Sequence, residues 1–163
     1  MVGRLYKPVS CQAYARGLLH GYPVLRVKLI NLLGEAIELA LPVDTGFEGA
    51  VMLDQDTYSF FAVGELPREA WRTYRTLAGP LPVRTARAYV ELGGGRFEAL
   101  VETPIYGGGK RLLGRELLNK LIVILDGPSN LACVAEPADS GPETCGQTTS
   151  ATGRQGRCSS LYC

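Results

Sequence analysis

The chain has 163 residues, which is enough for one domain of ordinary size with a buried core. Its 17 Lys and Arg residues nearly cancel its 16 Asp and Glu residues, so no strong field draws it to nucleic acid or anionic lipid. The apolar runs are too short for a membrane-spanning helix, and the N-terminal segment lacks the apolar core of a signal peptide. We therefore expect a soluble cytoplasmic protein with no membrane and no nucleic-acid partner.

Cysteine and histidine usage limits the possible chemistry. The five cysteines follow neither a C-x-x-C nor a Cys/His zinc pattern, and the single histidine, His20, excludes a site built from several imidazoles. We expect no metal and no cofactor. The odd number of cysteines and a reducing compartment favour free thiols, with Cys133 as an ordinary core residue of a strand.

Short apolar or alternating segments, separated by turns containing Gly and Pro, predict strands along most of the chain. In chain order, the predicted strands cover residues 22–31, 36–43, 50–53, 71–78, 82–92, 96–106, 122–126 and 131–136. One short helix is predicted after the N-cap Asp54 and ends at Gly64, and another lies within residues 112–121. Regular short strands and little helix favour an all-β fold, a closed barrel with one short C-terminal helix.

The composition changes near the C-terminus. From about Glu136 the chain is rich in Ser, Thr, Gly and Pro and has few aliphatic residues, so this segment cannot bury enough surface to fold alone. We predict a disordered tail over residues 136–163. The domain then covers residues 21–135, and residues 1–20 form an N-terminal extension.

The glycine-rich segments give little support for a phosphate site. Residues 107–110 read GGGK, but Arg111 stands where a P-loop requires Ser or Thr, and neither glycine triplet completes G-x-G-x-x-G between a strand and a helix. We interpret both triplets as loops. A phosphate-binding function would require a bound anion near residues 107–111.

Asp44-Thr45-Gly46 interrupts two apolar runs where a continuous strand would be expected. Asp and Gly favour turns, so the simplest interpretation is a hairpin corner. Apolar residues on both sides, however, place this loop low in the barrel. A partly desolvated carboxylate is costly unless it is hydrogen-bonded, paired or used in chemistry. Asp44 is therefore the candidate catalytic residue.

This loop and the later segment LLGRELL at residues 112–118 together resemble the retropepsin-like aspartic proteases, the single-lobed relatives of pepsin. In that family a hydrophobic strand enters Asp-Thr-Gly, and two aliphatic residues and a glycine precede a short helix near the C-terminus. The resemblance covers about residues 20–135. It implies a retropepsin-like closed acid-protease barrel with a flap hairpin.

The resemblance also implies a role for each matching residue. Asp44 would be half of a catalytic dyad, in which one carboxylate activates a water and the other donates a proton to the scissile carbonyl. Thr45 would reach across to the partner loop, and Gly46 would let backbone and substrate approach closely. Glu48 and Arg115 would pair beside the dyad and brace the active-site loop.

Because the chain holds only one Asp-Thr-Gly, the resemblance implies a homodimer with one Asp44 from each subunit. The flap would lie at Ala78-Gly79-Pro80-Leu81 and close over a peptide or unfolded protein substrate. The chain would then be an aspartic endopeptidase, a hydrolase without metal or cofactor. The alternative is a non-catalytic dimerisation or peptide-binding module of the same fold, with a structural Asp44.

Overall fold

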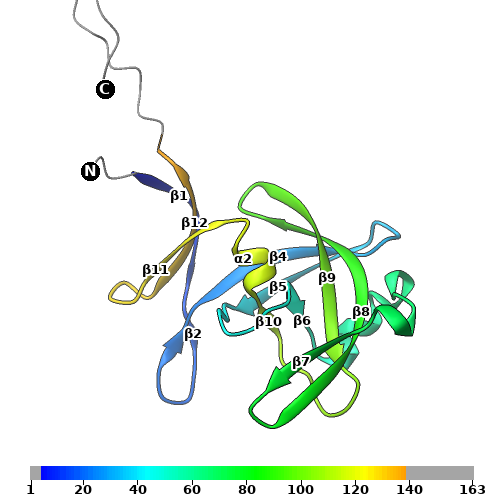
Figure 1. Cartoon of the computed structure of the whole chain (residues 1–163). Helices are drawn as coiled ribbons and strands as arrows, with labels where there is room; N and C mark the ends of the chain where they lie inside the picture. Colours follow the sequence, from blue (N-terminus) through cyan, green and yellow to red (C-terminus); the bar gives the residue numbers. More distant parts are fainter. Residues whose placement is uncertain (1–4, 139–163) are drawn as a thin grey trace, which may run out of the picture.

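The computed structural model describes residues 5–138, which form a β-rich body with two short α-helices (Figure 1). The strands are β1 (Tyr6–Ala13), β2 (Ala15–Arg16), β3 (Gly21–Tyr22), β4 (Val24–Ile30), β5 (Ala36–Pro42), β6 (Val51–Met52), β7 (Arg72–Thr76), β8 (Gly79–Leu92), β9 (Gly95–Pro104), β10 (Leu112–Leu113), β11 (Ile122–Asp126) and β12 (Leu131–Pro137). The helices are α1 (Gln55–Ser59) and α2 (Arg115–Leu118), with 3-10 turns η1 (Ala62–Gly64) and η2 (Arg68–Ala70). The predicted all-β fold is confirmed.

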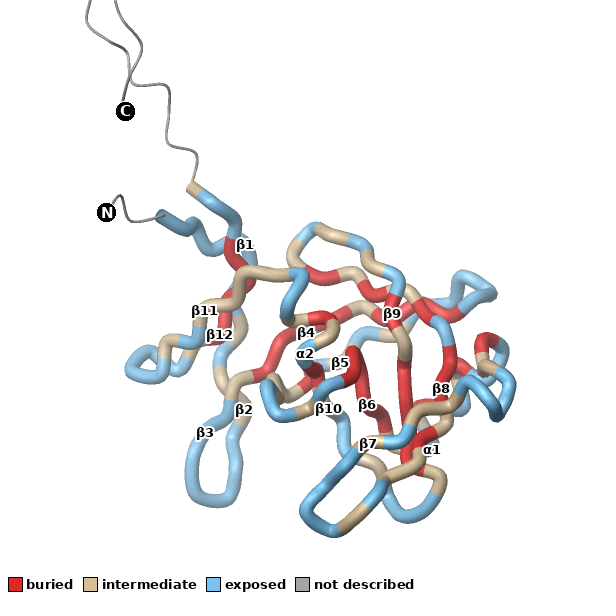
Figure 2. The backbone as a smooth tube through the Cα atoms, viewed as in Figure 1, coloured by how far each residue is buried: buried red, intermediate tan, exposed pale blue. Residues whose placement is uncertain are grey.

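Seven strands form the main sheet, which curves into a barrel. Its order is β10-β6-β9-β8-β4-β5, with β7 also paired to β8. A bridge between Val43 and Leu113 connects the end of β5 to β10, so the two ends of this path meet. The buried stretches of β4, β6, β8 and β9 face one another across the interior (Figure 2). Aliphatic residues with almost no exposed surface fill that core, among them Leu25, Val51 and Val101.

Local sequence explains the first hairpin and the first helix. β4 and β5 pair antiparallel, from Val24 opposite Pro42 to Ile30 opposite Ala36, and this register places one face of the hairpin against the core. Asp54 caps α1 as predicted, because its carboxylate accepts the Thr57 N–H at 2.9 Å. This backbone hydrogen bond, followed by the bond from Arg111, lowers the pKa of Asp54 to about 2.

The two ends of the described chain form a separate three-stranded sheet of order β1-β12-β11. Register places Cys11 of β1 opposite Cys133 of β12, and the two are joined by a disulfide. The prediction of free thiols is therefore wrong for this pair. Their separation of 122 residues hides the pairing, because only the register of β1 against β12 brings the two sulfurs together. The other three cysteines lie outside the described residues.

The predicted tail and N-terminal extension overlap with this terminal sheet. β12 continues to Pro137, so Glu136 lies in a strand, and residues 139–163 of the predicted tail lie outside the described residues. Within the predicted extension, β1 pairs with β12, and β2 forms a small hairpin with β3. No helix within residues 5–138 is long and apolar enough to cross a membrane.

Candidate active site

Asp44 lies immediately after β5, where the chain leaves the barrel wall. Its backbone N–H donates to the Leu113 carbonyl at 2.9 Å, and its own carbonyl accepts the Phe47 N–H at 3.3 Å. One carboxylate oxygen, Oδ1, accepts the Gly46 N–H at 2.8 Å. The side chain is half-buried, so the loop holds a carboxylate in a set orientation and leaves part of it accessible.

The loop between β5 and β6, residues 43–50, is called the Asp44 loop below. It is hydrogen-bonded directly to the segment that begins α2. The Gly114 N–H donates to the Ala50 carbonyl at 2.9 Å, and the Arg115 N–H donates to the Phe47 carbonyl at 2.8 Å. A side chain at Gly114 would collide with the Gly49 carbonyl and the Phe47 ring. Glycine is required here because the two backbones approach too closely for a Cβ atom. The two halves of the motif, far apart in sequence, thus form one structural unit.

The charged pair expected beside the loop is present in the structure. Arg115 Nη2 lies 3.1 Å from Glu48 Oε1, with side chains 47% and 70% exposed. An ion pair so open to water stabilises a single chain by at most about 1 kcal/mol. Thr45 and Gly46 are also exposed. The residues predicted for the site therefore gather at one end of the barrel, on a surface that one chain leaves open to solvent.

A hairpin of β7 and β8 lies over this loop and forms the other wall of a pocket. The hairpin projects from the barrel, and its turn is exposed (Figures 1 and 2). The cavity between hairpin and loop has a volume of about 240 Å³. It is lined by Asp44, Gly46, Phe47, Glu48, Met52, Tyr74, Arg75, Thr76 and Leu81.

The residues predicted as a flap form the tip and the start of β8. The Ala78 N–H donates to Thr76 Oγ1 at 3.2 Å, and this hydroxyl donates to the Gly79 carbonyl at 2.7 Å. Gly79, with φ of 112°, begins β8 and is followed by Pro80. Of the predicted flap residues, Leu81 reaches the pocket that contains Asp44.

Comparison with known proteins gives a match in structure. No family model matches the sequence, and no curated protein matches it significantly. A retropepsin-like aspartic protease from Rickettsia conorii is similar at a TM-score of 0.53 and 16% identity, over 85% of this chain and 98% of that chain. EIAV protease complexed with the inhibitor HBY-793 is similar at a TM-score of 0.43 and 14% identity, over 65% of this chain and 93% of that chain. The chain has a retropepsin-like fold.

Beneath the pocket of this retropepsin-like fold lies a buried charged group that sequence reasoning missed. Glu102 of β9 is 0% exposed, and its Oε2 accepts the Tyr74 hydroxyl at 2.7 Å. Burial raises the pKa of Glu102 to about 7, although the bond from Tyr74 and the charge of Arg72 oppose this shift. The sequence feature that could have revealed Glu102 was a lone carboxylate within the apolar end of a predicted strand.

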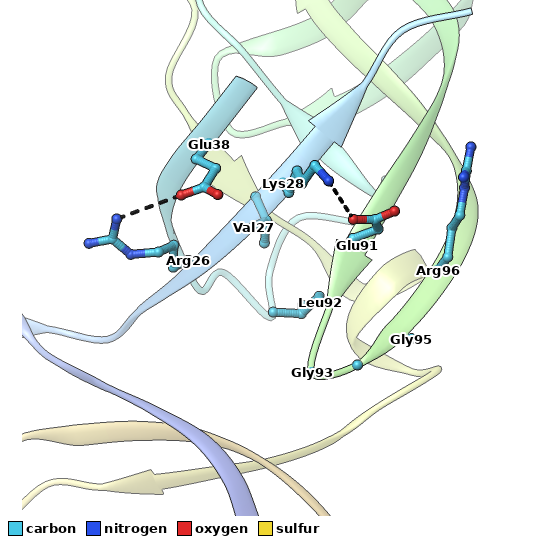
Figure 3. A pocket seen from close by; sticks show the side chains of 10 residues that line it. Arg26, Val27, Lys28, Glu38, Glu91, Leu92, Gly93, Gly95 and Arg96 are labelled. Atoms are coloured by element: carbon cyan, nitrogen blue, oxygen red, sulfur yellow. Dashed lines mark hydrogen bonds and ion pairs between the residues drawn. The ribbon is translucent and has the colours of Figure 1, made fainter. Parts of the chain in front are cut away.

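A second hollow lies away from Asp44, beside the turn between β8 and β9 (Figure 3). Its volume is about 360 Å³, and its charged side chains largely pair with each other. Lys28 Nζ lies 3.0 Å from Glu91 Oε2, and Arg26 Nη1 lies 4.0 Å from Glu38 Oε2. These balanced, partly exposed pairs supply no group that would act on a substrate.

Metal or phosphate binding finds no support in the part of the chain that the structure describes. Within residues 5–138, no group of three or more His, Cys, Asp or Glu side chains is placed to hold a metal ion. In the glycine-rich loop, the Arg111 guanidinium binds Asp54 and donates to Thr57 Oγ1 at 3.0 Å. Its charge is therefore used to brace the start of α1.

Proposed function

We propose that this chain is an aspartic endopeptidase that acts as a symmetric homodimer, with one Asp44 from each subunit. The observation that carries this proposal is the Asp44 carboxylate, oriented by the Gly46 N–H at the mouth of a pocket covered by a hairpin. The retropepsin-like fold supports it, as do the hydrogen bonds that join the Asp-Thr-Gly loop to the Gly-Arg segment in this chain.

A second copy is required because one chain offers only part of the chemistry. Asp44 and Glu48 are the carboxylates that line the pocket, and Glu48 is already paired with Arg115. A two-fold axis beside the exposed Thr45 and Gly46 would bring two copies of Asp44 together. Two carboxylates about 3 Å apart share one proton, so one remains protonated while the other is ionised.

In the proposed reaction, the ionised carboxylate takes a proton from water while the water oxygen attacks the scissile carbonyl carbon. The protonated carboxylate donates its proton to the carbonyl oxygen. The carboxyl that took the proton from water then gives it to the amide nitrogen as the C–N bond breaks, and the other carboxylate takes back a proton from a hydroxyl of the tetrahedral intermediate. No covalent intermediate with the enzyme forms. Phe47, Met52 and Leu81 give the pocket an apolar part, which fits a peptide with an apolar side chain next to the cleaved bond.

A subunit-mixing experiment tests the shared site. Wild-type chains are mixed with a ninefold excess of Asp44→Asn chains, and exchange is verified with two different affinity tags. Random pairing leaves about one wild-type chain in ten with a wild-type partner, so activity per wild-type chain should fall about tenfold. An excess of Asp56→Asn, a change at an exposed residue of α1, serves as the matched control: all chains in that mixture should be active, so activity per total chain should equal that of wild type.

Two results would count against the proposal. Constant activity per wild-type chain, with exchange verified, would mean that each chain carries a complete site. Binding of peptides without cleavage at any pH would instead favour the non-catalytic module. Location is a separate matter: disulfides persist mainly in oxidising compartments, so the Cys11–Cys133 bond weighs against the expected cytoplasmic location, which stays a prediction.

A further inference from the structure

Glu102 is a buried carboxylate that the proposed reaction does not use. It lies on β9, in the barrel wall behind the pocket, opposite Thr85 of β8 and Met52 of β6. Its side chain is 0% exposed, and its Oε1 has no hydrogen-bond partner. Such a group is expensive to bury, so its retention calls for a physical reason.

The contacts of Glu102 lead to the hairpin that covers the pocket. The Tyr74 hydroxyl of β7 donates to its Oε2 at 2.7 Å, and Arg72 Nε of the same strand lies 3.7 Å from its Oε1. Arg72 Nη1 in turn donates to Glu116 Oε2 of α2 at 2.6 Å. The carboxylate therefore connects the barrel wall to the hairpin and, through Arg72, to the helix that follows Gly114.

The same carboxylate also touches the Asp44 loop. A side chain at Gly49 would collide with Glu102 Oε2, which shows how closely the loop backbone passes over this oxygen. The Tyr74 ring packs edge-on against Phe47 of the loop, with 5.3 Å between ring centroids. Tyr74 also lines the pocket itself. One tyrosine is thus held by the carboxylate below and by the loop beside it.

We propose that Glu102 is a positioning residue that, through Tyr74, holds the β7–β8 hairpin in place over the Asp44 loop. Its importance for catalysis rests on the proposed function, but the tether itself does not. The charged and titratable groups that face Glu102 are Arg72 and Tyr74 from β7 and Glu116 from α2, with Tyr58 of α1 nearby. β6 and β8 place uncharged residues opposite it.

The strength of this tether depends on the charge of Glu102. An ionised carboxylate accepts a stronger hydrogen bond from Tyr74 than a protonated one does, and it attracts Arg72. Burial raises the pKa of Glu102 to about 7, so the carboxyl is mostly protonated at pH 5 and mostly ionised at pH 8. The bond from Tyr74 and the charge of Arg72 act in the opposite sense and lower this pKa, so these two hairpin contacts favour the ionised form, and the hairpin should be held more firmly at pH 8 than at pH 5. Glu102→Gln keeps the size and one acceptor but removes the charge at both pH values.

The test measures amide hydrogen exchange in residues 72–81 together with peptide hydrolysis, at pH 5 and pH 8. At pH 8, Glu102→Gln and Tyr74→Phe should each speed hairpin exchange by about tenfold or more, as expected for the loss of a hydrogen bond to a charged group. At pH 5, Glu102→Gln should exchange like wild type. Glu98→Gln, an exposed glutamate on the same strand, is the matched control and should match wild type at both pH values.

Hydrolysis separates positioning from a purely structural role. KM should rise in Glu102→Gln and Tyr74→Phe at pH 8 with kcat within about twofold, since a displaced hairpin weakens substrate binding more than the chemical step. The wild-type KM should be lower at pH 8 than at pH 5, because the hairpin is held more firmly at pH 8. This difference should vanish in Glu102→Gln.

Several outcomes decide the matter. If Glu102→Gln fails to fold, Tyr74→Phe still tests the tether, because it keeps the carboxylate and the ring. Hairpin exchange equal to wild type in Tyr74→Phe at pH 8 would overturn the proposal, whatever the activity. If the variants showed faster hairpin exchange but wild type cleaved no peptide, the tether would be supported and the proposed function would be wrong.

Discussion

The buried carboxylate of Glu102 makes the stability of the fold depend on pH in a way that one substitution isolates. Its pKa rises from an ordinary value of 4.5 to about 7 in the folded chain, mainly because burial penalises the ionised form. A change of this size corresponds to about 3 kcal/mol of unfolding free energy. This contribution is fully present below pH 4.5 and is lost as the pH rises through 7, because the carboxylate must then ionise inside the protein.

Wild type should therefore lose about 3 kcal/mol more stability than Glu102→Gln between pH 4.5 and pH 8, which is a difference of roughly 10 °C in melting temperature for a domain of this size. Urea unfolding, followed by the fluorescence of Trp71, the single tryptophan, measures this at fixed protein concentration. The control Glu98→Gln should lose as much stability between pH 4.5 and pH 8 as wild type does. If the unfolding free energies of wild type and Glu102→Gln changed equally between pH 4.5 and pH 8, Glu102 would not have a raised pKa in the folded chain.

This variant also separates local from global effects. At pH 8, Glu102→Gln should loosen the β7–β8 hairpin, and yet its global stability relative to wild type should be about 3 kcal/mol more favourable than at pH 4.5. Positioning residues commonly cost stability, since a charge kept for function must be desolvated. A stability of Glu102→Gln that fell relative to wild type between pH 4.5 and pH 8 would show that the fold favours the ionised form of Glu102, contrary to a raised pKa.

Three further predictions concern the proposed catalytic residue, the disulfide and the C-terminal segment. Asp44→Asn should reduce peptide hydrolysis at least about 10²-fold, through loss of general acid–base catalysis, while unfolding midpoints stay near those of the Asp56→Asn control; retained activity would remove Asp44 from the mechanism. Cys11→Ser should cost about 2–5 kcal/mol in unfolding free energy, because the bond closes a loop of 122 residues, and a reductant should lower the stability of wild type but not of this variant. Removal of residues 139–163 should leave the melting temperature unchanged within about 2 °C, because that segment has few aliphatic residues; a larger fall would show that it packs on the domain.

The features that the sequence predicted well are those encoded by neighbouring residues. The hairpin of β4 and β5 follows from period-two alternation around the turn at Gly34, and the start of α1 follows from the capping residue Asp54. The order of the two motif segments pointed to the fold because each segment has its own local pattern. Sequence alone also showed a single Asp-Thr-Gly in the chain, and the proposed homodimer rests on that count.

The features that sequence reasoning missed depend on which distant segments become neighbours. The Cys11–Cys133 bond requires the register of β1 against β12, and no local pattern sets that register. Glu102 looks like an ordinary strand residue until Tyr74 and Gly49 are packed over it. Its burial, its raised pKa and its link to the hairpin all depend on segments that are distant in sequence, among them Tyr74 and the loop at Gly49. By itself the sequence predicted most of the strands and turns and the candidate carboxylate Asp44, because neighbouring residues encode these features, whereas only the tertiary structure showed that the buried carboxylate of Glu102 contacts the hairpin beside it.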